Sequence, residues 1–350
     1  MNIFIVIATI VVLIVLHELG HFIFAKKYGV RVDEFGVGIP PRLFGKKIGE
    51  TIYSINLIPL GGFVKLHGED AAEDDEKSFS QKPIYQRAVI LFAGVAAFFV
   101  VAAIIFSIIS YTGVRTAVAD DFVADDAQII ITQVAPESPA DEAGMRMGDV
   151  IKKVNGEEVS KAQETISLLD AEEVNLLLLR GEKEISVSVI PRSEHPEKEG
   201  PLGIGLIRTV DKSYPLYAAP FQGTVMMAQM TGAVVHGFYT ALSSVVTGKP
   251  LPDGMEIGGP VRIVEMGSQT IDRGVYDYLY FVALISISLA VINILPIPAL
   301  DGGRLFFLGI EKVKGSPIPQ KLEQGMNVFF FLALITLMLF VTFKDIQGLI

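Results

Sequence analysis

His17-Glu18-Leu19-Gly20-His21 lies inside an otherwise apolar stretch, residues 3–25. Residues four apart lie on one face of an α-helix, about 6 Å apart along its axis. Two imidazoles at that spacing can hold one metal ion, with the carboxylate of Glu18 beside it as general base. A bilayer-spanning helix needs about this length, and ionisable groups inside one mark a functional site. The stretch therefore predicts zinc chemistry in a transmembrane helix at residues 1–26.

The whole chain has the composition of a membrane protein. Its 350 residues are 51% hydrophobic, and the mean hydropathy is +0.48. Further apolar blocks predict three more transmembrane helices, at residues 88–110, 279–311 and 324–343. The first block has no basic leader and no small-residue cleavage site, which predicts a retained helix and not a signal peptide. The chain has no cysteine, so only His, Asp and Glu can ligate zinc, and its net charge of −10 argues against a nucleic-acid partner.

The distribution of charge predicts the orientation. Between Lys26 and Lys65 basic residues outnumber acidic ones, which predicts that the segment at 27–87 is cytoplasmic and the N-terminus outside. Residues 111–278 then lie outside. Residues 216–248 are apolar, but a further crossing there would put the basic residues after Asp301 on the wrong side. They are expected to form an amphipathic helix on the outer membrane surface, with Met226, Met230 and Val234 as its apolar stripe.

Two histidines do not complete a zinc site, because a third protein ligand is needed. As one helix, residues 279–311 would be about 48 Å long, too long for a hydrocarbon core of about 30 Å. Pro296 and Pro298 break it, and broken backbone at membrane depth survives only where it lines a cavity or is buried in protein. Asp301 follows this break and is the remaining candidate ligand. Alternatively, Asp301 caps the helix that follows.

At this point the chain resembles the site-2 protease family of intramembrane zinc metalloproteases, in particular the bacterial regulator-of-sigma-E protease branch. The resemblance rests on HELGH at 17–21, NILPIPALDGGR at 293–304 and a domain between them. It implies one zinc ion per chain. It also implies that Glu18 is the catalytic base and that the three metal ligands are His17, His21 and Asp301.

The same resemblance implies that Asn293, Pro296 and Pro298 hold the substrate backbone near the zinc. One departure concerns the second span. The family pattern has a Gly-Pro-x-x-Asn turn there, whereas this chain has Gly94-Val95-Ala96-Ala97-Phe98. The departure puts a packing or gating role of the second span in doubt, but not the metal site.

Residues 127–207 read as a small α/β domain with an Asn-Gly turn at 155–156. The domain resembles the permuted bacterial PDZ type, which would place its peptide-terminus loop at Gly203-Ile204-Gly205-Leu206. Such a domain either binds an extended peptide by strand addition or only fills the entrance to the site. Strand-like alternation within residues 27–87 predicts a short sheet, and the resemblance implies a membrane-associated β-hairpin or loop there. An edge strand beside the zinc would hold a substrate extended.

Together these features predict a polytopic α-helical membrane protein with an inserted PDZ-like domain, in the bacterial cytoplasmic membrane. The predicted activity is intramembrane proteolysis. The resemblance implies single-span membrane substrates, such as an anti-sigma factor or a signal-peptide remnant, already shortened outside. A membrane-tethered PDZ adaptor with a non-proteolytic metal site is one alternative, and it would be expected to lack the base or a ligand. A metal transporter is another, and it would carry acidic or His residues in several spans.

Overall fold

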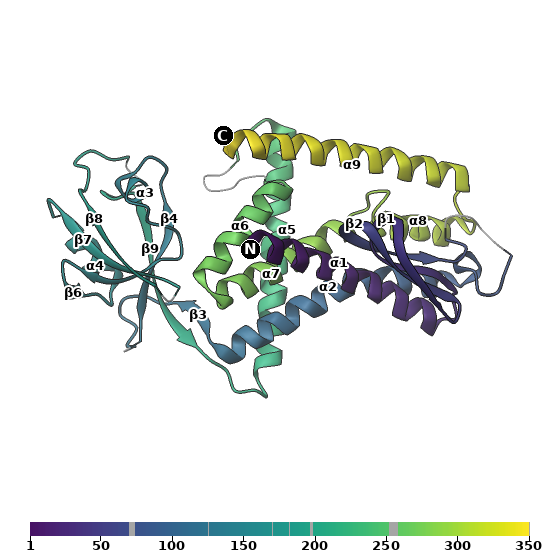
Figure 1. The fold of residues 1–350 in the computed structure, drawn as a ribbon, viewed down its shortest axis with the longest axis horizontal. Helices are drawn as coiled ribbons and strands as arrows, with labels where there is room; N and C mark the ends of the chain where they lie inside the picture. The colour runs from purple at the N-terminus through teal and green to yellow at the C-terminus, as the bar shows by residue number, and fades with distance from the viewer. Residues whose placement is uncertain are drawn as a thin grey trace. The chain divides into compact units, whose positions relative to one another are not determined.

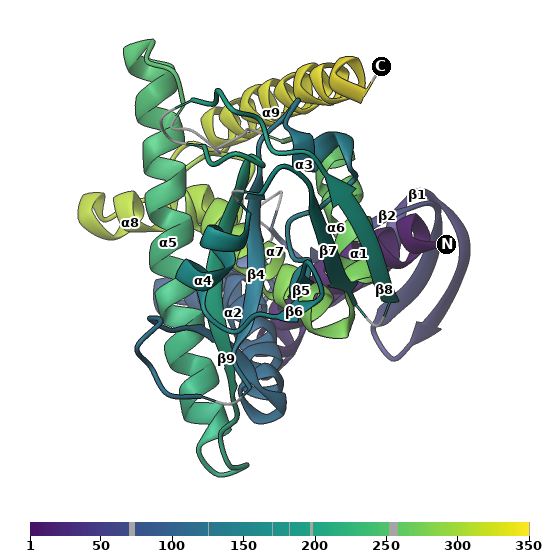
Figure 2. The same ribbon diagram turned by 90° about the vertical axis from the view of Figure 1, so that its left-hand side faces the viewer.

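The computed structural model describes residues 1–69, 74–124, 126–169, 171–181, 183–196, 199–251 and 258–349. Its chain divides into two compact units (Figures 1 and 2). The first, here called the helical unit, comprises residues 1–106, 224–268 and 281–350. The second, the inserted domain, comprises residues 107–223 and 269–280. The candidate site lies in the helical unit.

Four helices in the described part of the chain are long and apolar enough to cross a membrane. They are α1 (Asn2–Lys27), α2 (Ile84–Thr112), α7 (Val275–Ile294) and α9 (Gln320–Leu349). Each contains a window of at least 18 residues dominated by Ile, Leu, Val, Phe and Ala, with at most two charged residues. Within such a window only a helix satisfies every backbone group internally.

Further helices, among them α5, α6 and α8, accompany the four long ones in the described residues. Helix α5 (Ala219–Thr247) runs across the direction of α1, α2 and α9 (Figure 1). Met226 is buried, and Met230 and Val234 are half-buried, so the predicted stripe packs inward. The exposed apolar side chains lie on another face: Val235, Phe238, Tyr239, Leu242, Val245 and Val246.

Helix α6 (Pro260–Arg273) was not among the predicted elements. Its N-terminus is capped from the far end of the chain. The Asp345 carboxylate of α9 accepts hydrogen bonds from the Gly259 and Arg262 N–H groups, both at 3.1 Å. A carboxylate there satisfies N–H groups that have no partner within the helix.

The third apolar block is broken, as its prolines predict. Helix α7 ends at Ile294 and α8 (Asp301–Lys314) begins after a turn at 295–300. The chain doubles back closely. A Cβ at Gly302 would lie 2.2 Å from the Ile294 carbonyl oxygen, and one at Gly303 would lie 2.3 Å from that of Ile297. Only glycine fits at both positions, so the Gly-Gly pair fixes the first turn of α8 against the break.

The segment between α1 and α2 folds into a small sheet from β1 (Val32–Ile48) and β2 (Thr51–Leu66). Residues 34–37 pair with 62–65 on one side and with 52–55 on the other, while 42–48 pair with 51–56. Residues 62–66 therefore form one edge of the sheet. A 3₁₀ turn (Phe79–Gln81) follows. One buried cluster joins the end of α1, the sheet, α2 and α8: Ala25, Val30, Val32, Leu66, Phe79, Ile90, Leu91 and Leu308.

The inserted domain is a mixed α/β fold. Its strands and helices, in chain order, are β3 (Val114–Ala117), β4 (Gln128–Val134), α3 (Pro139–Glu142), β5 (Val150–Val154), β6 (Glu157–Glu158), α4 (Ala162–Leu168), β7 (Val174–Arg180), β8 (Lys183–Val189) and β9 (Ile204–Lys212). The sheet has the order β3-β9-β4-β5-β7-β8, with β6 paired to β5. Alternate apolar residues of the strands form its core, including Ile129, Ile131, Leu176 and Leu178.

The sheet extends beyond residues 127–207 at both ends. Val114–Ala117 pairs with the end of β9, and β9 continues to Lys212. Strand β3 has only four residues and directly follows the long apolar helix α2, so it is too short to show an alternation of apolar and polar residues in the sequence. The carboxylate of Asp120, which comes next, accepts hydrogen bonds from the N–H groups of Ala162 and Gln163 at the start of α4. These bonds hold the pKa of Asp120 below its ordinary value.

Candidate metal centre and catalytic cavity

His17 and His21 lie one turn apart on α1, and both are buried. Their Nε2 atoms are 3.2 Å apart, and the two rings meet edge to face with centroids 4.7 Å apart. His21 is also held from its other side, because its Nδ1 atom is 2.9 Å from the carbonyl oxygen of Ile90 on α2. A partner of that kind fixes which nitrogen of a histidine is free to bind a metal.

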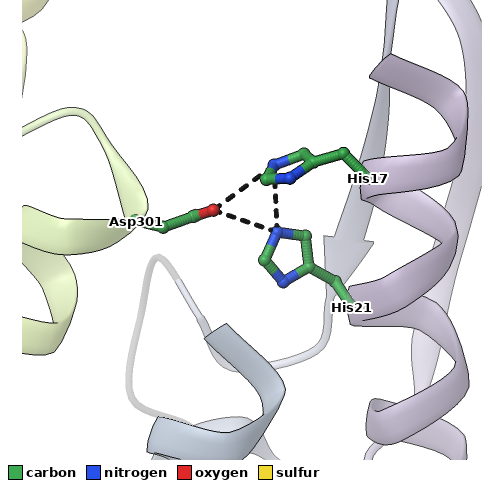
Figure 3. A group of neighbouring side chains, drawn as sticks. All are labelled: His17, His21 and Asp301. Atoms are coloured by element: carbon green, nitrogen blue, oxygen red, sulfur yellow. Dashed lines mark hydrogen bonds and ion pairs between the residues drawn. The ribbon is translucent and has the colours of Figure 1, made fainter. Parts of the chain in front are cut away.

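Asp301 reaches the same point from the first turn of α8 (Figure 3). Its Oδ2 atom lies 3.3 Å from the Nε2 atoms of both His17 and His21. The helix begins at Asp301 itself, its N-cap residue is Leu300, and Oδ2 accepts no hydrogen bond from a described backbone N–H group. This carboxylate oxygen is thus directed at the imidazoles and not at the helix N-terminus.

The three atoms fit a zinc ion. Zinc takes His nitrogen and Asp oxygen at about 2.0–2.2 Å, so adjacent ligand atoms of a tetrahedral site lie about 3.3 Å apart. The three measured separations are 3.2, 3.3 and 3.3 Å. One ligand atom from each of these three residues lies within 4.8 Å of the other two. Three protein ligands leave the fourth position open, which is the arrangement of catalytic zinc sites.

Glu18 lies beside the three ligands in a cavity of about 470 Å³. One wall of this cavity is the edge of the small sheet, residues 63–66 of β2, and another is formed by Ala299 and Leu300 before α8. The sheet edge is close to the carboxylate, since a Cβ at Gly62 would lie 3.7 Å from Glu18 Cγ. The cavity therefore brings together an acidic side chain, a candidate metal site and a strand edge.

The cavity borders a second one of about 550 Å³ between α2, α8 and the start of α9. Leu91, Glu69 and Arg304 line both, and the last two form an ion pair. In the second cavity Arg87 of α2 forms a two-point ion pair with Glu311 of α8. Neither pair was predicted, because residues more than two hundred positions apart give no local signal in the sequence.

Helix α2 approaches α1 closely at two glycines. A Cβ at Gly20 would lie 2.4 Å from the Ala93 carbonyl oxygen, so the two backbones nearly touch there. A Cβ at Gly94 would lie 2.2 Å from His21 Nε2 and 2.8 Å from His17 Cε1. The space beside the metal-facing nitrogens thus exists only because residue 94 has no side chain.

Gly94→Ala is expected to abolish zinc binding and cleavage, because the added methyl group displaces the imidazole of His21. Gly309→Ala on α8 is the matched control, since a Cβ there meets nothing within 4 Å. Zinc content per chain, measured by mass spectrometry after dialysis, checks the result. Stoichiometric zinc in Gly94→Ala would mean that the histidines do not form the metal site as described.

The remaining predicted site residues lie apart from the ligands. Asn293 donates its side-chain N–H to the Leu289 carbonyl oxygen of its own helix at 2.9 Å. Pro296 is exposed and Pro298 is buried in the break, while the cavity wall is formed by the residues that follow. The structure therefore brings the three ligands and Glu18 together, but it does not bring Asn293 or the two prolines into the cavity lining.

The Gly203-Ile204-Gly205-Leu206 segment lies in the inserted domain. Gly203 precedes β9 with φ +76°, and a Cβ there would lie 2.4 Å from that of Ser138. The next three residues belong to β9 and pair with β4. Strand β3 pairs only with residues 209–212 of β9, so no described strand pairs with the other edge of residues 204–206. Strand β9 also contacts α4.

Comparison with known proteins relates the whole chain to metallopeptidases. The model of "Peptidase family M50" matches residues 5–337. A Clostridium perfringens protein with the name "Putative zinc metalloprotease CPE1693" is 36% identical over 95% of each chain. The regulator of sigma-W protease RasP of Bacillus subtilis is 28% identical, over 96% of this chain and 96% of its own. The zinc metalloprotease RasP of Geobacillus kaustophilus is also 28% identical, over 96% and 95%.

Proposed function

The chain belongs to peptidase family M50, and we propose that this zinc metallopeptidase cleaves the membrane-spanning segments of single-span proteins. One observation carries the proposal. Three ligand atoms and Glu18 converge within a unit built from helices apolar enough to cross a membrane. Ionisable groups are too costly in such helices to be kept there without a function.

In this proposal His17, His21 and Asp301 hold the zinc. A zinc ion held by these residues would supply Lewis-acid chemistry and would make a water molecule acidic near neutral pH. Glu18 accepts the proton of the attacking water and passes it to the nitrogen of the leaving amine. The Ile90 carbonyl keeps His21 in the orientation that directs Nε2 toward the other ligands.

The edge of the small sheet holds the substrate. A peptide bond in a helix is shielded from attack, so a membrane-spanning substrate must be extended before it is cut. Residues 62–66 form an edge of the sheet and line the cavity beside Glu18. A substrate segment added to this edge would be extended by backbone hydrogen bonds, largely independently of its side chains.

The proposed location is a bacterial cytoplasmic membrane, and the basic residues between α1 and α2 support an orientation with the small sheet on the cytoplasmic side and the inserted domain outside. The inserted domain is proposed to act as a PDZ-like filter that admits substrates already shortened outside. The uncovered start of β9 beside α4 is where an extended peptide terminus would add. As the family resemblance implies, a membrane-anchored anti-sigma factor is the proposed substrate type, and the B. subtilis relative is named as a regulator of sigma-W.

Removing the filter is expected to let uncut substrates be processed. The structure shows where to cut the chain, because the Tyr214 N–H donates to the Ser110 carbonyl oxygen at 2.9 Å and the two ends are adjacent. Residues 113–213 are replaced by a short Gly-Ser linker, and cleavage of full-length and pre-shortened substrates is compared by gel electrophoresis. Zinc content shows that the metal centre remains assembled. An unchanged preference for shortened substrates would contradict size exclusion.

Cleavage in liposomes tests the proposed function. The purified chain is reconstituted with a single-span substrate, and the products are mapped by mass spectrometry. The expected cut lies within the apolar segment of the substrate, while a soluble peptide of equal length without an apolar segment remains intact. Cleavage confined to residues outside the apolar segment would refute intramembrane proteolysis.

A further inference from the structure

The two imidazoles of the candidate centre are supported in different ways. His21 has the Ile90 carbonyl oxygen as partner for its Nδ1 atom. The Nδ1 atom of His17 is buried, and no described residue forms a hydrogen bond of normal geometry with it, although the Gly94 backbone gives this imidazole a weaker polar contact. Metal-binding histidines almost always have such a bond, which fixes the orientation of the ring. The orientation of the His17 ring therefore depends on its other contacts.

The ring of Phe98 occupies one face of His17. The two ring centroids are 4.7 Å apart, and the ring planes are inclined by only 17°. Phe98 is 2% exposed and lies one helical turn after Gly94. Helix α2 therefore leaves space beside the histidines at Gly94 and packs a flat ring against His17 at Phe98. Stacked rings at this separation attract one another beyond the simple burial of area.

Phe98 is itself fixed from the third span. Ser286 of α7 is completely buried, and its hydroxyl donates a hydrogen bond of 2.8 Å to the Phe98 carbonyl oxygen. The same helix, α7, leads through the following turn to Asp301. Helix α7 therefore contacts the residue that stacks on His17 and also carries the chain toward Asp301.

We propose that Phe98 is a positioning residue for the zinc centre, which keeps Nε2 of His17 directed at His21 and Asp301 by stacking on the face of the imidazole. The inference rests on the proposed zinc site. An imidazole that shares the charge of a bound cation is attracted by the electron-rich face of a phenyl ring, so the support strengthens when metal is bound.

If Phe98 only stabilised the fold, its loss would lower stability without a specific effect on zinc binding. A second buried phenylalanine on α2 serves as the control. Phe106 is also completely buried, but it lies eight residues, about 12 Å, further along the same helix. Phe98→Leu and Phe106→Leu thus each remove a buried phenyl ring from α2, one beside the imidazole and one away from it. Zinc affinity is measured in detergent by competition with a chelator, and stability by thermal unfolding.

Phe98→Leu is expected to weaken zinc binding at least 10-fold, the usual effect of losing a group that orients a metal ligand. Phe106→Leu should lower the melting temperature but change zinc affinity by less than 2-fold. The visible absorption spectrum of the cobalt-loaded protein should change in the first variant and not in the second. Pentafluorophenylalanine at position 98 keeps the shape but reverses the charge distribution of the ring face, and it too should weaken zinc binding.

Wild-type affinity in Phe98→Leu, or an equal loss in both leucine variants, would overturn the inference. If Phe98→Leu fails to fold, the zinc affinity of the pentafluorophenylalanine variant tests the role, because that side chain keeps the shape of phenylalanine. Unchanged affinity with that ring would likewise refute the role. If the wild-type chain itself bound no zinc, the proposed function would fail first, so the two failures are distinguishable.

Discussion

Glu18→Gln is expected to bind one zinc ion per chain as the wild type does, while cleavage falls by about 10²- to 10⁴-fold. Glutamine has the shape of glutamate but cannot accept the proton of the attacking water, and general base catalysis contributes a factor of that size. Glu18 is not one of the three converging ligands, so the metal should stay. Zinc content and initial cleavage rates in liposomes are measured on the same preparation.

Glu76→Gln is the control for this variant, since Glu76 is exposed and lines neither cavity. It should cleave at the wild-type rate. Near-normal turnover in Glu18→Gln with zinc bound would remove Glu18 from the mechanism, and loss of zinc from the variant would make it a ligand.

Asp301→Asn is expected to be folded, membrane-inserted, depleted of zinc and inactive. Asparagine can still accept hydrogen bonds at a helix N-terminus, but its neutral amide is a much poorer zinc ligand than a carboxylate. The substitution therefore removes the ligand and leaves any capping role intact. Zinc after dialysis is measured by mass spectrometry, and folding is measured by circular dichroism.

Asp345→Ala is the matched comparison, because Asp345 does cap a helix, through the N–H groups of Gly259 and Arg262. Losing a cap typically costs about 1 kcal/mol of stability, and this variant should keep its zinc. If Asp301→Asn instead kept full zinc and near-normal turnover, Asp301 would be a structural residue and the third ligand would lie elsewhere.

The local sequence was sufficient to predict the candidate ligands. His17 and His21 are four residues apart, and Pro296, Pro298 and the Gly-Gly pair mark the break that leads to Asp301. These signals are local, because helix spacing and proline geometry act within a few residues. Length and uniform apolarity likewise indicated the four long helices.

Contacts between spans could not be predicted in the same way. A helix that is apolar on every side shows no periodicity, so the sequence of α2 does not reveal that Gly94 and Phe98 face the histidines. The partner of His21 is the backbone carbonyl of Ile90, and any residue at that position would provide a carbonyl, so the sequence does not reveal this contact. Helix α6 is strongly amphipathic, but its N-terminus depends on Asp345, more than eighty residues away.

The central claim is that cleavage depends on zinc held by these three residues. The direct measurement follows zinc per chain and cleavage rate together while the wild-type protein is stripped with a chelator and reloaded. The account predicts one zinc ion per active chain, a rate proportional to occupancy, and recovery on reloading; Asp301→Asn should recover neither zinc nor activity. Undiminished cleavage at zero zinc, or full loading and recovery in Asp301→Asn, would contradict it.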